Sequence, residues 1–140
     1  MDACQAIDAL LRANAGVLAA VGLDSEGGVK VYPLLAPQGT KPPYIVYKQV
    51  DGVLQPVITA VPPFLWQDRI QLTAVAMDYA TVKAVLKAAA KACNYQSGTI
   101  GGVPVSSIVK ETVGGDIFDI GTRTCEQSCD LMVLYFDTGS

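Results

Sequence analysis

The side chains that could do chemistry in this chain are carboxylates and thiols, because the sequence contains no histidine. Histidine is the commonest general base and metal ligand, so its absence removes Ser-His and Cys-His mechanisms and most zinc sites. A group of carboxylates lies late in the chain: Glu111, Asp116, Asp119, Glu126 and Asp130. Asp116 and Asp119 share a glycine-containing loop, but a calcium loop needs more oxygen ligands at defined spacing. We therefore expect solvated carboxylates, no bound metal or cofactor, and no enzymatic activity.

The four cysteines do not form a recognisable site either. None of Cys4, Cys93, Cys125 and Cys129 belongs to a CxxC pair of the kind found in zinc and redox sites. Cys125 and Cys129 are four residues apart in a predicted strand, or about 13 Å at ~3.3 Å per residue, which is too far for a disulfide. No local sequence supplies a base that would activate a thiol. We expect reduced and mostly buried thiols.

The composition points to a protein that buries surface against other chains. Hydrophobic residues make up 51% of the 140 residues and charged residues only 16%, so few charges remain to cover a monomer. The net charge of -3 argues against duplex binding, which needs a basic patch, and we expect no direct sequence-specific nucleic-acid contact. The acidic start and the lack of a long apolar run predict no signal peptide and no membrane span, with synthesis in the cytoplasm.

Apolar periodicity predicts two main helices, over 3–13 and 79–92, with a short helical turn over 17–21 after the first. Asp78 is expected to cap the second main helix, and Asn94 to end it in a left-handed conformation. Alternating or β-branched runs predict strands over 29–32, 44–50, 66–77, 103–113 and 122–136. The expected fold is α+β in a single domain, 1–140, with a mainly antiparallel or mixed sheet of four to five strands. Two main helices pack on one face of that sheet, and an extended hairpin arm projects from it.

The arm spans about 51–66 and joins the two central strands. It contains three prolines, which disfavour an ordinary central strand, and it has no charge between Asp51 and Asp68. Such an apolar segment is expected to dock on a neighbouring subunit, or else to fold back over its own core. The residues expected at the subunit interface are Val53, Leu54, Val57, Ile58, Val61 and Phe64.

Lys83, Lys87 and Lys91 recur every four residues on the second main helix. This row is either a solvated face or a contact with an acidic face of a neighbour.

Five short segments carry a likeness to a known family. The first helix is followed by Val31-Tyr-Pro33, the Ala36-Pro-Gln-Gly39 loop and Pro43-Tyr-Ile-Val-Tyr47. Downstream, the strand Arg69-Ile-Gln-Leu-Thr-Ala74 leads at once into Asp78-Tyr-Ala-Thr81, which opens a helix. Over roughly residues 3 to 93 the chain resembles the tail terminator, or tail completion, proteins of long-tailed bacteriophages with non-contractile tails. The last third matches only in its order of elements.

This resemblance implies a structural protein of the virion. Members form a hexameric ring that caps the tail tube at its head-proximal end, stops its growth and joins it to the head connector. The partners implied are further copies of the chain, the tail tube protein and the connector or neck protein. On this reading Lys83, Lys87, Lys91, Asp116, Asp119 and Arg123 are candidates for the axial contacts with tube and connector.

Other functions remain open on the sequence alone. A head-completion or neck ring protein of the same type of phage would share the ring's size and symmetry. A small cellular α+β binding module could dimerise through the same arm. An enzyme that uses carboxylates alone is the remotest alternative.

The proposed arm contact can be tested by charge insertion. Replacing Val57 and Ile58 with aspartate is expected to leave a folded monomer that no longer assembles, because two unpaired charges at an interface cost several kcal/mol. Light scattering of the purified variant would measure its mass, and an intact assembly would refute the role of the arm.

Overall fold

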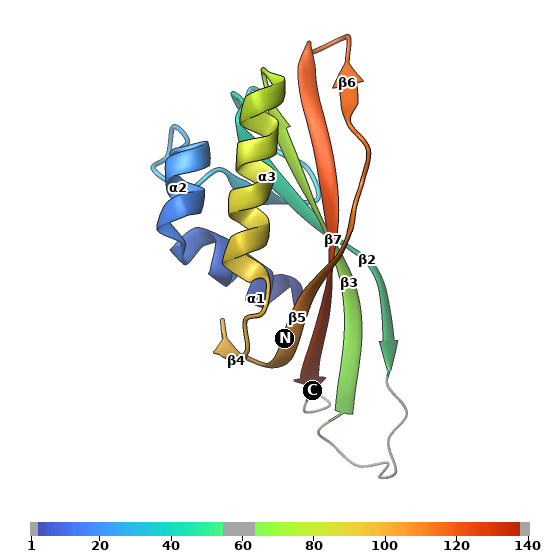
Figure 1. Ribbon diagram of the computed structural model, residues 1–140. Helices are drawn as coiled ribbons and strands as arrows, with labels where there is room; N and C mark the ends of the chain where they lie inside the picture. Colours follow the sequence, from blue (N-terminus) through green and yellow to red (C-terminus); the bar gives the residue numbers. More distant parts are fainter. Residues whose placement is uncertain (1–2, 55–63, 138–140) are drawn as a thin grey trace.

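A curled, mixed β-sheet with helices on one side is the main feature of the computed structural model, which describes residues 3–54 and 64–137 (Figure 1). The helices are α1 (Ala3–Ala13), α2 (Ala15–Val21) and α3 (Tyr79–Cys93). The strands are β1 (Val31–Pro33), β2 (Tyr44–Leu54), β3 (Phe64–Ala76), β4 (Gly98–Ile100), β5 (Val103–Val113), β6 (Ile117–Asp119) and β7 (Thr124–Asp137). The α+β class is confirmed. The expected count of four to five strands was too low, because β4 and β6 lie where the sequence predicted a turn and a loop.

Long antiparallel pairings form the centre of the sheet. The strand order is β1-β2-β3-β7-β5-β4, and β6 pairs with β7. Strand β3 pairs with β7 over its whole length, from Phe64 opposite Asp137 to Ala76 opposite Cys125. Among the strands of residues 3–54 and 64–137, β1 alone runs parallel to its neighbour, which is β2. The sheet is therefore mixed, with one short parallel edge strand.

The three helices cover the same face of the sheet, and the core lies between them (Figure 1). Strand β3 turns its alternate residues Ile70, Leu72, Ala74 and Ala76 into this core, as the sequence predicted. Helix α1 contributes Ile7 and Leu11, which are fully buried. Beyond the helices, the ends of β2, β3 and β7 extend as a bare part of the sheet (Figure 1).

Side-chain caps explain where the helices begin. Asn14 caps α2 by accepting a hydrogen bond from the Val17 amide at 3.0 Å. Asp78 caps α3, as expected, and its carboxylate accepts from the Thr81 amide at 2.7 Å. The expectation for Asn94 was wrong: Asn94 is extended, with φ of -64°, and the following residue, Tyr95, takes the left-handed conformation with φ of 64°.

The two edges of the sheet differ in how far their backbone hydrogen-bonding groups are already paired. On the β5 side, the Tyr95 amide donates to the Ile108 carbonyl at 2.8 Å, and Asn94 Oδ1 accepts from the Lys110 amide at 3.0 Å. On the other side, β1 pairs with β2 only as far as Tyr47. Among the described residues, no strand pairs with the outer side of β2 beyond that point.

The expected arm can be followed only at its base. Pairing of β2 with β3 continues to Leu54 opposite Trp66, so the two strands extend further than the sequence predicted. Residues 55–63, which include Val57, Ile58 and Val61, lie outside the described residues, and the arm's contact role stays a prediction.

Within the described part of the chain, no single helix is long and apolar enough to cross a membrane. Helices α1 and α2 taken together have sufficient length and apolar composition, but they are bent by 78° relative to each other.

Gly52 of β2 lies in a tight approach between β2 and β3. Gly52 pairs with Asp68, and a Cβ at Gly52 would lie 2.5 Å from Asp68 Oδ1 and 2.9 Å from Gln49 Nε2. Because Asp68 is buried, with 1% of its surface exposed, its short side chain has little room to move away.

Gly52→Ala is therefore expected to lower the free energy of unfolding by about 1–3 kcal/mol through overpacking. Urea denaturation would measure the loss. The matched control is Gly115→Ala, because nothing lies within 4 Å of a Cβ at Gly115. Equal stability of the two variants would contradict this packing argument.

Two of the four thiols belong to the core. Burial raises the pKa of Cys93 to about 12 and that of Cys129 to about 11, whereas Cys4 and Cys125 are half-buried. At about pH 8 we expect iodoacetamide to modify Cys4 and Cys125 at least about a hundredfold faster than the two core thiols, because the thiolate is the reactive form. Mass spectrometry of the partly labelled native protein would assign the sites. Rapid labelling of Cys93 or Cys129 in the folded protein would show that the core is open there.

Candidate functional site

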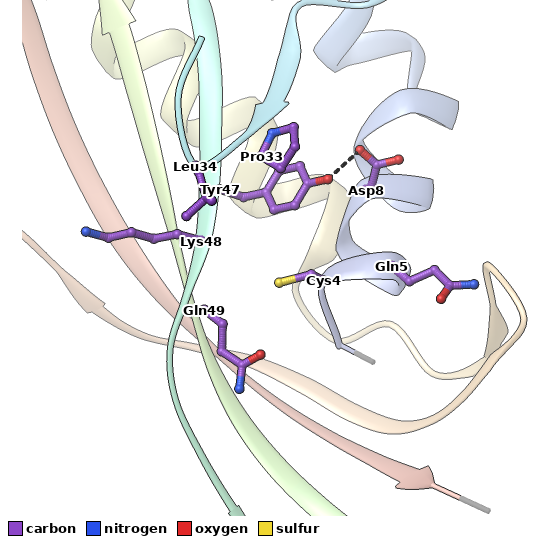
Figure 2. Close-up of a pocket in the computed structure, with 8 residues that line it drawn as sticks. All are labelled: Cys4, Gln5, Asp8, Pro33, Leu34, Tyr47, Lys48 and Gln49. Carbon is purple, nitrogen blue, oxygen red and sulfur yellow. Dashed lines mark hydrogen bonds between the residues drawn. The ribbon is translucent and has the colours of Figure 1, made fainter. Parts of the chain in front are cut away.

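A pocket beside α1 is the first place to look for chemistry. It has a volume of about 490 Å³ and is lined by Cys4, Gln5, Asp8, Pro33, Leu34, Tyr47, Lys48 and Gln49. Figure 2 shows Tyr47 of β2 and Asp8 of α1 pointing toward each other, and the Tyr47 hydroxyl donates to Asp8 Oδ1 at 2.8 Å. Arg12 Nε also donates to the Asp8 carboxylate, at 3.0 and 3.1 Å to its two oxygens.

These contacts join α1 to the sheet, and they do not activate the Tyr47 hydroxyl or the Asp8 carboxylate for catalysis. Burial, and then the hydrogen bond to Asp8, raise the pKa of Tyr47, so the hydroxyl stays protonated and keeps donating. Arg12 Nη2 reaches further, to the Val31 carbonyl at 2.6 Å. With its carboxylate held by the tyrosine and the arginine, Asp8 has a structural role. Within residues 3–54 and 64–137, no three Cys, Asp or Glu side chains are grouped so as to hold a metal ion.

The lysine row of α3 borders a groove between this helix and β5. The groove has a volume of about 550 Å³, and its lining residues are Lys83, Leu86, Lys87, Ala90, Lys91, Asn94, Tyr95, Lys110, Val113 and Cys129. The sequence predicted the three lysines on one helix face. It did not predict Lys110, which the pairing of β5 with β7 brings to the same groove.

A charged cluster surrounds Lys83, the first lysine of the row. Lys83 Nζ donates to Asp116 Oδ1 at 2.6 Å and to Gln127 Oε1 at 2.9 Å, and the Tyr79 hydroxyl donates to Asp116 Oδ2 at 3.0 Å. The hydrogen bond from Lys83 is the main cause that lowers the pKa of Asp116, and the same bond raises the pKa of Lys83. Two residues predicted as separate axial contacts therefore form one ion pair.

Asp119 and Arg123 lie in and beside the turn between β6 and β7, at the same end of the sheet as the start of α3 (Figure 1). Asp119 Oδ1 accepts from the amides of Gly121 at 2.9 Å and Thr122 at 3.4 Å, so this carboxylate shapes its own turn. Arg123 is exposed and has φ of 56°. Of the predicted axial residues, Arg123 thus offers an exposed charge at this end.

Those predicted interface residues that the structure describes lie at the opposite end. Val53 and Leu54 end β2 and are 54% and 46% exposed, respectively. Phe64 is the first residue of β3 and pairs with Asp137. Asp119 and Arg123 are thus separated from Val53 and Leu54 by the length of the sheet.

Sequence reasoning missed a charge cluster on the outer face, the sheet face turned away from the helices. Arg69 of β3 lies 3.2 Å from Asp130, 3.5 Å from Glu111 and 3.7 Å from Asp51. These carboxylates come from β7, β5 and β2, so the cluster spans four neighbouring strands. Three carboxylates around one guanidinium give this cluster a net negative charge. No spacing rule along the sequence brings these four residues together.

Exposed apolar side chains at the two lateral edges were also missed. Leu34 and Leu35 follow β1 and are 75% and 81% exposed. On the other side, in and beside β6, Ile117, Phe118 and Ile120 are 57%, 53% and 77% exposed. Large apolar side chains left in water at both edges are typical of surfaces that other chains cover.

Comparison with known proteins agrees with this picture of a subunit. Residues 5–134 match the family described as tail completion protein gp17, which confirms the resemblance seen in the sequence. No curated protein matches the sequence. Among solved structures, the chain is similar to one from the "Virion of native gene transfer agent (GTA) particle", with 14% sequence identity and a TM-score of 0.70. That match covers 94% of this chain and 92% of the other, and at this identity it concerns the fold alone.

Because the family match spans nearly the whole sequence, the chain belongs to the family of tail completion protein gp17 and is a structural protein of a phage tail.

Proposed function

We propose that the protein forms a hexameric ring that caps the tail tube, ends tail polymerisation and provides the joint to the head connector. It would then lie at the head-proximal end of the tail and contact three partners: its own copies, the tube protein and the connector or neck protein. Its role is structural and non-catalytic.

The difference between the two ends of the sheet is the observation that carries this proposal. One end has charged groups beside the apolar residues of β6, namely the Lys83–Asp116 pair, Asp119 and the exposed Arg123, whereas the other end has the exposed apolar Val53 and Leu54. A subunit placed between two different partners needs two unlike axial surfaces that need not fit each other. A subunit of a uniform filament needs two axial surfaces that are complementary, because each binds the other on the next copy. This asymmetry supports a cap between the tube and the connector.

The lateral edges supply the second requirement, contacts that close a ring. Leu34 and Leu35 lie beside β1, at one edge of the sheet. Strand β6 pairs with the start of β7 opposite β3, and so presents Ile117 and Phe118 at the other edge. Two different patches at opposite edges suit a heterologous contact, which closes into a ring when its rotation divides the circle.

Deletion of the gene from its phage, followed by electron microscopy of the lysate, is the test of this function. We expect overlong tails and unattached heads, because nothing would stop polymerisation of the tube or join it to the connector. Tails of normal length beside heads that leak DNA would instead assign the protein to the neck. Normal particles would refute both roles.

Arg123→Glu tests the axial surface in the same complementation system. Because Arg123 is exposed, the variant is expected to fold and form rings, while the fraction of tails joined to heads falls at least several-fold through charge reversal. Counting joined particles on micrographs measures the effect. Lys41→Glu, an exposed reversal in the loop after β1, is the control. Normal joining by the Arg123 variant would remove this residue from the axial contact.

A further inference from the structure

We propose that the groove between α3 and β5 is a binding site for an extended, acidic segment of a neighbouring virion protein, with carboxylates at alternate positions. The inference deepens the proposed function and rests on it for the identity of the neighbour as a tail or connector component. The binding chemistry itself follows from the groove.

The groove combines an apolar floor with a cationic rim. Leu86, Ala90 and Cys129 are buried at its base, and Val113 is 51% exposed at its side. Lys87 and Lys91 stand exposed on the helix wall, and Lys110 stands exposed on the strand wall. Among the described residues, none of these three lysines takes part in a salt bridge.

Basic side chains cluster in this groove although the chain as a whole has a negative net charge. The net charge is -3, yet four of the ten basic side chains, Lys83, Lys87, Lys91 and Lys110, line this one groove. Lys83 is paired with Asp116, but Lys87, Lys91 and Lys110 have no salt-bridge partner among the described residues. Like charges brought together in this way repel one another, so a ligand that supplies carboxylates relieves that repulsion. The groove therefore favours an acidic occupant over a neutral or basic one.

The chain itself shows the chemistry at one end of the groove. Asp116 precedes the exposed β6 strand and places its carboxylate on Lys83, with a second hydrogen bond from the Tyr79 hydroxyl. In this internal example a single carboxylate from an extended segment pairs with the first lysine of the row. Lys87 and Lys91 continue the same row along α3 and remain available to a second segment of this kind.

The spacing of the row selects an extended ligand. Successive lysines four residues apart on a helix are separated by about 6 Å along its axis. Alternate residues of an extended chain are about 7 Å apart and point to the same side. A strand with carboxylates at every second position can therefore pair with Lys87 and Lys91, and its intervening side chains face the opposite wall beside Val113.

Binding can be measured on the purified full-length protein by fluorescence anisotropy of a labelled, end-capped peptide, Glu-Val-Glu-Val-Glu-Val. We expect saturable binding that weakens at least tenfold when the salt concentration rises from about 50 to about 500 mM, because the contact is between opposite charges. The same peptide with lysine in place of glutamate is the ligand control and should not bind. Equal binding of the two peptides, or no binding of the acidic one, would overturn the proposal.

The double variant Lys87→Glu/Lys91→Glu is expected to weaken binding of the acidic peptide at least tenfold. Lys41→Glu/Lys48→Glu makes the same change of charge at exposed positions outside the groove and should leave the affinity within about twofold. Circular dichroism would verify that both variants are folded. Equal affinities of the two variants would place the peptide elsewhere and refute the site.

Two further readouts separate this inference from the proposed function. If the groove variant binds no peptide and also fails to self-associate by light scattering, the occupant is a second copy and the proposed partner is wrong. If it assembles normally, binds no peptide and joins fewer tails to heads, the proposal is supported. The gene deletion tests the cap independently, because it does not depend on what the groove binds.

Discussion

The pairing of β3 with β7 is the constraint on which the rest of the structure depends. It sets the register of the whole sheet, because β2 adds to one side of this pair and β5, β4 and β6 to the other. A shift by one residue would exchange the buried Ile70 and Leu72 with the outward-facing Arg69 and Gln71. The same register places Arg69 among carboxylates from three other strands and Lys110 opposite the lysines of α3. The charged surfaces are therefore products of one pairing.

Much of the local structure could be predicted from the sequence, because its causes are local. The alternation of Ile70, Leu72 and Ala74 predicted the buried face of β3, and Asp78 predicted the start of α3, since a cap acts within one helical turn. The predicted left-handed residue after that helix was wrong by one position. Tyr95 takes the left-handed conformation, and the Asn94 side chain instead accepts a hydrogen bond from the Lys110 amide of β5. That bond depends on tertiary structure, which a residue preference cannot contain.

The candidate surfaces were predictable only in part, because they too depend on contacts between residues far apart in the sequence. A repeat of four residues was enough to place Lys83, Lys87 and Lys91 on one face of a helix. Nothing in the sequence near Lys110 or Asp116 indicates that they lie beside that row. Lys110 is in β5 and Asp116 directly precedes β6, and both strands are positioned by pairing with β7. The predicted arm remains a prediction beyond Leu54, and the strand β6 was missed because its three residues are too few to form a pattern.

The unequal protection of the two sheet edges limits how copies of this chain can join. Beyond Tyr47, β2 has no partner strand among the described residues on its outer side, whereas β5 is closed by the Tyr95 amide and the Asn94 side chain, and β4 offers only three residues. Growth of a fibril by edge-to-edge strand pairing requires each added molecule to expose an unpaired edge like the one that it has just covered. Among the described residues, the other margin of the sheet offers only the three-residue strands β4 and β6. Strand addition at β2 would therefore leave no edge of similar length for a next copy, and the fold carries its own protection against fibril growth.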